Sequence, residues 1–288
     1  MKPRTHLLVI DPQNDFCDLP EAWRPLNPLT ATPRAPALPV PGAHADLQRV
    51  AQLIRVAGAA LSDITITLDS HHRVDIAHPP FWVQADGGAV APFTPITAAQ
   101  VREGAYRPRD AAALPRTLAY LDELEARGRY TLMVWPVHCE IGTWGHGVHP
   151  GLQAAYADWE TAQLRQVAKV NKGENPWTEH YSALLAEVPA ADDAHTQLNT
   201  ALLRRLGEAD RILVAGEAGS HCVKATVEDL VEQLGPQGAP RITLLTDAMS
   251  PVAGFHTQQQ AFVAAMQARG ATLATTAQVQ QQLQSTAA

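Results

Sequence analysis

The sequence predicts an α/β protein with a doubly wound sheet. Short apolar runs rich in Val, Ile, Leu and Thr recur along the chain, and this composition is typical of parallel strands covered on both faces. Between them lie segments with apolar residues at steps of three and four, which predict amphipathic helices. Alternating strands and helices favour right-handed crossovers, which place the loops after the strands at one edge, where ligands bind.

The individual elements follow from these patterns. Three helices are clearest: one with Leu47, Val50, Ile54 and Ala57 on one face, one over 223–234 that ends at Gly235-Pro236, and one over 256–268 followed by Gly270. The predicted strands are 6–11, 63–69, 130–136, 167–172, 211–217, 241–247 and 271–276.

Composition excludes several classes of function. The chain has 288 residues, 46% of them hydrophobic, so a large core is expected and global disorder is not. The formal net charge is −7 with no dense basic block, which argues against nucleic acid and anionic membranes as partners. No apolar run approaches the ~18 residues of a membrane span. We see no signal peptide, and three cysteines cannot all pair, so a reducing, cytoplasmic location is expected.

We expect one domain over residues 1–288, because no clear boundary interrupts the pattern. Two Pro-rich insertions, at about 20–42 and 79–115, follow strand ends. Segments of this length without regular structure are usually covers over a site or disordered.

Chemically active residues stand just past several predicted strands. Each has an ordinary interpretation alone: an Asp at a strand end usually forms a turn, and a lone Cys is usually a small buried hydrophobe. In a doubly wound sheet, however, these ends converge on one cleft. The residues concerned are Asp11, Asp69, His71, His72, His78, His138, Cys139, Lys172 and Cys222.

Cys222 is the best candidate nucleophile. It follows a strand and opens a strongly amphipathic helix, and a helix N-terminus favours a thiolate. Asp11 is placed to take the thiol proton and return it to a leaving group, with Lys172 nearby. Cys139 also follows a strand but lacks a clear helix start, and Cys17 lies in a loop.

A second group suits a divalent metal. Asp69, His71, His78 and His138 offer one carboxylate and up to three imidazoles, a set that Zn²⁺ or Fe²⁺ accepts. His72 would point elsewhere in an extended segment and is left out. The alternative interpretation of this stretch is a polar loop.

Five motifs resemble one known family. They are VIDPQNDFC, TLDSHHRVDIAHPPFW, WPVHCEIGTWGHGVHP, VNKGENPWTEHYSAL and VAGEAGSHCVKATVEDL, in family order over about residues 6–250. In these motifs the chain resembles the nicotinamidase/isochorismatase-like cysteine hydrolases, and the nicotinamidases most closely. The resemblance implies a three-layer fold with a six-stranded, mostly parallel sheet, and a homo-oligomer.

The resemblance also assigns roles. It implies a triad of Asp11, Lys172 and Cys222, and a cis peptide between Glu217 and Ala218 with the N–H groups of Ala218 and Cys222 as an oxyanion hole. A metal (zinc, with iron or manganese as alternatives) would be held by Asp69, His71, His78 and His138, and Phe16 and Trp135 would line the substrate pocket. Two features depart from the pattern: His78 is one residue farther from His71, and Glu217 is unusual in a nicotinamidase.

The expected function is therefore an amide hydrolase that releases ammonia from nicotinamide or a related aromatic carboxamide. Two alternatives stay open. A sibling hydrolase would act on N-carbamoyl, ureido or other amides, and a non-catalytic member would keep the fold for binding alone.

Overall fold

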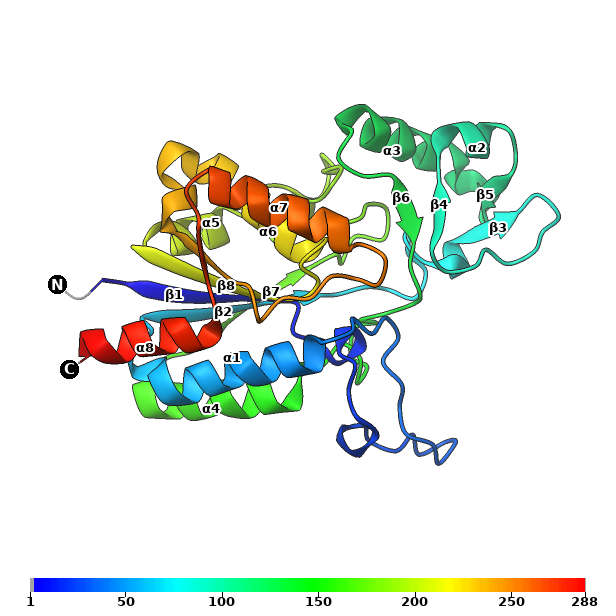
Figure 1. Ribbon diagram of the computed structural model, residues 1–288. Coiled ribbons are helices and arrows are strands. Elements are labelled where there is room, and N and C mark those ends of the chain that lie inside the picture. The colour runs from blue at the N-terminus through cyan, green and yellow to red at the C-terminus, as the bar shows by residue number, and fades with distance from the viewer. Residues whose placement is uncertain (1–2, 288) are drawn as a thin grey trace.

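A six-stranded parallel sheet forms the centre of the protein. The computed structural model describes residues 3–287 (Figure 1). The strand order is β10-β9-β8-β1-β2-β7, and every neighbouring pair is parallel. This confirms the predicted fold class. The strands are β1 (Thr5–Ile10), β2 (Asp63–Asp69), β7 (Ala168–Lys172), β8 (Arg211–Gly216), β9 (Ile242–Leu245) and β10 (Thr272–Ala274).

One predicted strand does not belong to this sheet. Within 130–136, only β6 (Leu132–Val134) is a strand, and it pairs antiparallel with β4 (Thr94–Ile96). β6 is as apolar as a strand of the central sheet, because the side chains of β6 are also largely buried. Leu132 and Val134 are buried, but β6 lies beside β4 at the edge of a lobe and outside the central sheet (Figure 1). Expecting a central strand here was wrong.

Helices cover both faces of the sheet and complete three layers (Figure 1). On one face lie α1 (Ala43–Ala57), α4 (Pro150–Gln163) and α8 (Thr276–Ala287). On the other lie α5 (Thr200–Gly207), α6 (Cys222–Leu234) and α7 (His256–Ala268). The expected apolar face of α1 is buried, as are Val223, Val227, Leu230 and Val231 of α6. None of the helices among residues 3–287 is long and apolar enough to cross a membrane.

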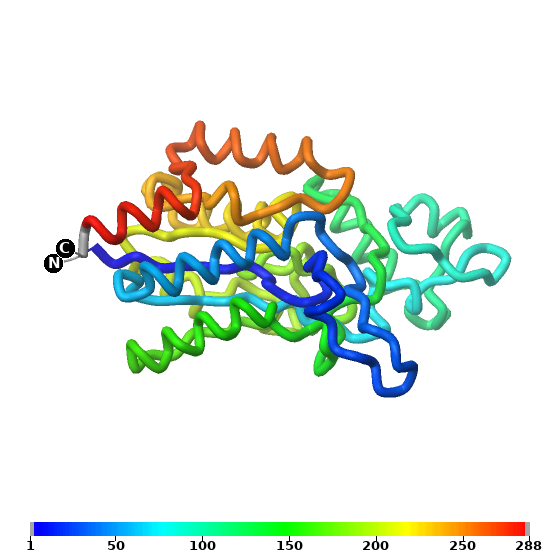
Figure 2. Tube along the Cα trace, turned by 60° about the horizontal axis from the view of Figure 1, so that its bottom comes forward, coloured from blue at the N-terminus to red at the C-terminus, as the bar shows by residue number. Residues whose placement is uncertain are grey.

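The two insertions differ in structure. Residues 20–42 run as extended chain with turns over one side of the molecule (Figure 2). Residues 79–115 instead contain short elements of their own: β3 (Trp82–Gln84), β4, α2 (Ala98–Arg102) and β5 (Tyr106–Pro108), with α3 (Leu114–Arg127) following. Together with α3 they form a lobe beyond the carboxyl ends of the strands (Figures 1 and 2).

The strand register decides which side chains meet at that edge. Asp69, the last residue of β2, lies directly beside Lys172, the last residue of β7. Ile10 of β1 lies beside Gly216 of β8, so the residues that follow these two strands leave the sheet together. The candidate site is built on these four strand ends.

Candidate active site and metal centre

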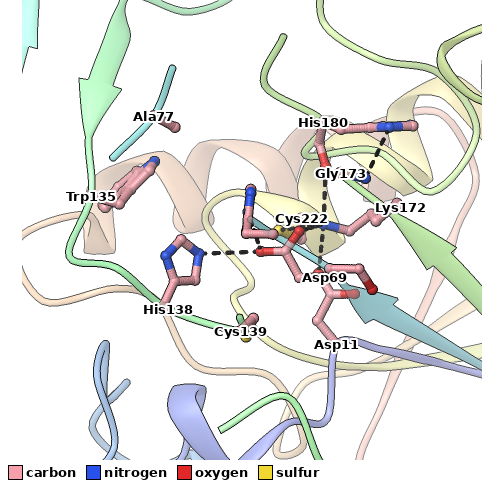
Figure 3. Close-up of polar contacts among 12 residues, drawn as sticks. Asp11, Asp69, Ala77, Trp135, His138, Cys139, Lys172, Gly173, His180 and Cys222 are labelled. Atoms are coloured by element: carbon pink, nitrogen blue, oxygen red, sulfur yellow. Dashed lines mark hydrogen bonds and ion pairs between the residues drawn. The ribbon is translucent and has the colours of Figure 1, made fainter. Parts of the chain in front are cut away.

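Lys172 is the centre of a buried cluster of charged groups. Its Nζ lies 2.9 Å from Asp11 Oδ2 and 2.8 Å from Asp69 Oδ1. It also donates hydrogen bonds to the carbonyl of His180 at 2.9 Å and to Cys222 Sγ at 3.6 Å (Figure 3). The Lys172 side chain is only 1% exposed. Burial opposes its charge, but Asp11 and Asp69 outweigh burial and raise the pKa of Lys172 well above its usual value.

Asp11 is fully buried at the end of β1. Its backbone turns sharply there, with a φ of 41°, and its N–H donates to Thr67 Oγ1 at 3.0 Å. The Thr67 hydroxyl in turn donates to Asp11 Oδ1 at 2.5 Å. Burial raises the pKa of Asp11 even though Lys172 acts in the opposite direction. A carboxylate whose pKa is raised is a better proton acceptor than an ordinary exposed Asp.

Cys222 is the first residue of α6 and is buried. We expected the helix N-terminus and Lys172 to favour the thiolate. Burial instead raises the pKa of Cys222 well above its usual value, because it outweighs Lys172, and Asp11 and Asp69 add to the rise. A thiol with a raised pKa becomes a nucleophile more readily when a base beside it takes its proton. A hydrogen bond joins the side chains of Asp11 and Cys222, which makes Asp11 a candidate for such a base.

The loop before Cys222 has the form that the sequence implied. The peptide bond between Glu217 and Ala218 is cis. Gly216 allows this loop to pass β1, since a Cβ at its position would lie 2.0 Å from the Ile10 carbonyl oxygen. In the described residues no protein acceptor takes the N–H of Ala218 or of Cys222. Two free N–H groups beside a thiol are the elements of an oxyanion hole.

Three histidines, with Asp69 beside two of them, gather next to this cluster. Ligand atoms of His71, His78 and His138 all lie within 4.8 Å of one another. Asp69 Oδ2 lies 3.0 Å from His71 Nε2 and 3.2 Å from His138 Nε2, and His78 Nε2 lies 3.2 Å from His138 Nδ1. Bonds of about 2.1 Å to one cation would place neighbouring ligand atoms roughly 3.0–3.4 Å apart. The three histidines could therefore hold a metal ion, with Asp69 on the Nε2 side of His138 and His78 on its Nδ1 side.

The surrounding residues orient two of the imidazoles. Asp75 Oδ2 lies 3.1 Å from His71 Nδ1, and the His72 carbonyl lies 3.1 Å from His78 Nδ1. Each contact is made by Nδ1, so Nε2 of that ring faces the other donors of the cluster, as is usual in metal sites. Burial lowers the pKa of His78 to about 2, so this ring is neutral, as a ligand must be. The donor set fits a divalent cation.

Sequence reasoning missed Asp75 and the His72 carbonyl. Asp75 stands four residues after His71, and that spacing was the available signal. The side chain of His72 is exposed, as expected, but its backbone lies in the site.

The remaining cysteines take no part in this cluster. Cys17 donates to the Gln13 carbonyl at 3.1 Å, and the N–H of Cys139 donates to Asp15 Oδ2 at 2.7 Å. Burial raises the pKa of both thiols well above the usual value. We therefore assign Cys17 and Cys139 a structural role.

A small cavity of about 20 Å³ connects Cys222 with the histidine cluster. Phe16 and Trp135 line this cavity. Asp69 and His138 also line it, from the side of the histidine cluster. Trp135 is fixed by a 3.0 Å hydrogen bond from its Nε1 to the Tyr181 hydroxyl. Further lining residues were not singled out from the sequence: Leu38, Glu179, His221 and Val252.

The comparison with solved structures supports the fold. No protein-family model matches the chain, and no curated protein sequence matches it. Among solved structures, yeast nicotinamidase Pnc1p bound to the inhibitor nicotinaldehyde aligns with a TM-score of 0.60 at 20% identity, covering 94% of this chain and 99% of that one.

Two further structures extend the comparison. The Acinetobacter baumanii nicotinamidase/pyrazinamidase aligns with a TM-score of 0.60 at 21% identity, over 96% of this chain and 98% of that one. The pyrazinamidase of Pyrococcus horikoshii, solved in complex with zinc, aligns with a TM-score of 0.52 at 19% identity, over 95% and 99%. This chain therefore has the fold of the nicotinamidase and pyrazinamidase structures.

Proposed function

We propose that the protein is an amide hydrolase that releases ammonia from nicotinamide or a related aromatic carboxamide. The observation that carries the proposal is the position of Lys172 Nζ, which contacts Asp11, Asp69 and Cys222 at once. One buried cation thus joins a base, a nucleophile and a candidate metal ligand. The fold shared with nicotinamidases and pyrazinamidases supports this reaction class.

In the first half-reaction the Cys222 sulfur attacks the carboxamide carbon while Asp11 takes the thiol proton. A C–S bond forms, and the carbonyl oxygen becomes an oxyanion that accepts hydrogen bonds from the N–H groups of Ala218 and Cys222. Asp11 then gives its proton to the nitrogen, the C–N bond breaks and ammonia leaves. Lys172 stays charged throughout and stabilises the carboxylate of Asp11.

In the second half-reaction a water attacks the thioester and Asp11 takes its proton. The C–S bond breaks, the sulfur regains a proton from Asp11, and the carboxylic acid leaves. The sum is one amide and one water converted into one acid and one ammonia.

Asp69, His71, His78 and His138 would hold the metal, for which we propose zinc, with iron or manganese as alternatives. When bound, a divalent cation supplies a Lewis-acid contact that orients an electron-rich ring atom of the substrate. The chain itself contributes the flat side walls, Phe16 and Trp135, which exclude water around an aromatic ring. We further propose a cytoplasmic homo-oligomer whose partner is a small amide and neither nucleic acid nor membrane.

The test is ammonia release from nicotinamide and pyrazinamide by the parent protein and by Cys222→Ala, with and without added Zn²⁺, Fe²⁺ or Mn²⁺. The parent is expected to release ammonia and Cys222→Ala to release none. Cys139→Ala is the matched control, because Cys139 is also buried, whereas the hydrogen bond from Lys172 goes to the sulfur of Cys222. Ammonia release by Cys222→Ala would contradict the thioester route.

A second candidate is a sibling hydrolase that acts on N-carbamoyl or ureido compounds. The cavity beside Cys222 is about 20 Å³, whereas a cavity of about 150 Å³ is known to hold a benzene ring. Neither a pyridine ring nor an N-carbamoyl or ureido compound fits in this volume, so the side chains that line the cavity must move for either ligand. Including such compounds in the same screen decides between the two: faster turnover of a carbamoyl compound than of nicotinamide would favour the sibling hydrolase.

A further inference from the structure

Glu217, at the base of the loop that carries Ala218, is fully buried and belongs to no part of the reaction described above. Its Oε2 accepts a hydrogen bond from the Ser250 N–H at 3.2 Å. Its Oε1 is buried, and no protein donor reaches it. A buried carboxylate oxygen without a donor is costly, whereas a protonated one can itself donate.

The acceptor for that proton is Asp46 of α1. A hydrogen bond joins the side chains of Glu217 and Asp46, and Asp46 is itself 5% exposed. The Ser250 hydroxyl donates to Asp46 Oδ2 at 2.6 Å, and Arg49 donates to Asp46 Oδ1 at 2.9 Å. Asp46 therefore has the donors that an ionised carboxylate requires, and Glu217 does not.

This pair ties three elements together at the oxyanion loop, which we define as residues 216–220. Ser250 contacts both carboxyl groups, and its carbonyl accepts the Gly219 N–H at 2.8 Å. The Ile10 carbonyl accepts the Glu217 N–H at 2.8 Å. The loop thus rests on β1, on α1 and on the segment after β9, and Ala218 is the residue enclosed by these contacts.

We propose that Glu217 and Asp46 share one proton and that this carboxyl pair positions the Ala218 N–H for the oxyanion. Glu217 is a positioning residue, since it acts through the loop and does not touch the reacting atoms. The inference rests on the proposed amidase function only for its kinetic readout.

The charge state of the pair follows from its surroundings. Burial and the nearby Asp46 raise the pKa of Glu217 well above its usual value, and burial raises the pKa of Asp46. The groups that face the pair come from three segments: Cys17 and Asp18 after β1, Arg49 on α1, and Asp247 after β9. Arg49 is the only cation among them, and half of its side chain is in solvent.

The kinetic test compares Glu217→Gln with Glu217→Leu. A glutamine keeps a donor for Asp46 and an acceptor for Ser250, and a leucine keeps neither. We expect Glu217→Leu to lower kcat about 100-fold, the usual effect of losing one oxyanion donor, with KM within about threefold because the pocket walls stay. Glu217→Gln should lose less than about tenfold. A parent-like kcat in Glu217→Leu, or an equal loss in both variants, would overturn the proposal.

A second measurement does not depend on activity. It tests the proposal even if the Glu217→Leu protein fails to fold, because it uses the parent and two conservative variants. The pKa of Glu217 is higher in the folded state than in the unfolded state. Protonated Glu217 therefore stabilises the fold fully at pH values below its unfolded-state pKa, and this stabilisation is lost as pH rises through its folded-state pKa. The free energy of unfolding of the parent should fall with rising pH more steeply than that of Glu217→Gln or Asp46→Asn, measured by denaturant titration. Coincident pH profiles would overturn the shared proton. An inactive parent with diverging profiles would refute the amidase function and leave the pair supported.

Discussion

The carboxylate of Asp69 joins the two halves of the site, with one oxygen 2.8 Å from Lys172 Nζ and the other 3.0 Å from His71 Nε2. The strand register produces this arrangement, because Asp69 and Lys172 are neighbours across β2 and β7. The charge that stabilises the lysine is thus also the charge offered to a metal. Any change at Asp69 should disturb both.

Asp69→Asn is expected to lose metal and activity together. The amide removes the negative charge that a cation and Lys172 share, while keeping the size of the side chain. We expect metal content of the purified protein to fall at least tenfold and kcat at least 100-fold, by elemental analysis and ammonia release. His72→Ala is the control, because that side chain is exposed and only its carbonyl lies in the site. Full metal content in Asp69→Asn would contradict the ligand assignment.

Asp75→Asn should weaken the metal site without removing a ligand. Asp75 contacts His71 Nδ1 at 3.1 Å, and loss of such an orienting partner typically costs 10–100-fold in metal affinity. The change is measured by competition with a chelator of known affinity. Unchanged affinity would mean that Asp75 only supports the loop, where it also accepts the Ala77 N–H at 2.9 Å.

Lys172→Met should destabilise the fold as well as abolish activity. The substitution leaves Asp11 and Asp69 buried without their shared cation, and breaking a buried ion pair on one side costs about 3–5 kcal/mol. Chemical denaturation of the metal-free protein measures the loss. Lys169→Met, on the same strand but exposed, should change the free energy of unfolding by less than about 0.5 kcal/mol. Equal stability of the two variants would refute this reasoning.

Stability should also depend on the protonation of Glu187. Burial raises the pKa of Glu187 to about 7 against an ordinary value of 4.5, even though Arg129 acts in the opposite direction. Folding favours the protonated form of Glu187. Its contribution to the free energy of unfolding is therefore complete below pH 4.5 and is lost as pH rises to about 7. The loss is on the order of 3 kcal/mol. Glu187→Gln should flatten this part of the unfolding profile, and an unchanged slope would exclude Glu187 as its source.

Sequence reasoning identified the strands that carry the site because each is a short apolar run followed at once by polar residues. It misplaced 130–136, since local composition does not say whether a buried strand lies in the main sheet or in an insertion. It also expected a lowered pKa for Cys222 from the helix start, whereas burial, which no linear pattern records, dominates. Asp75 and Asp46 were missed because their roles depend on partners that only folding brings near.

The sequence by itself determined the doubly wound fold and the residue types at the strand ends, because apolar periodicity and motif order are local properties of the chain. The tertiary structure decided which of these residues touch. It placed Asp69 between Lys172 and His71, closed the cavity beside Cys222 to about 20 Å³, and set Glu217 against Asp46. Distances, burial and shared protons arise from residues far apart in the chain, and only packing fixes them.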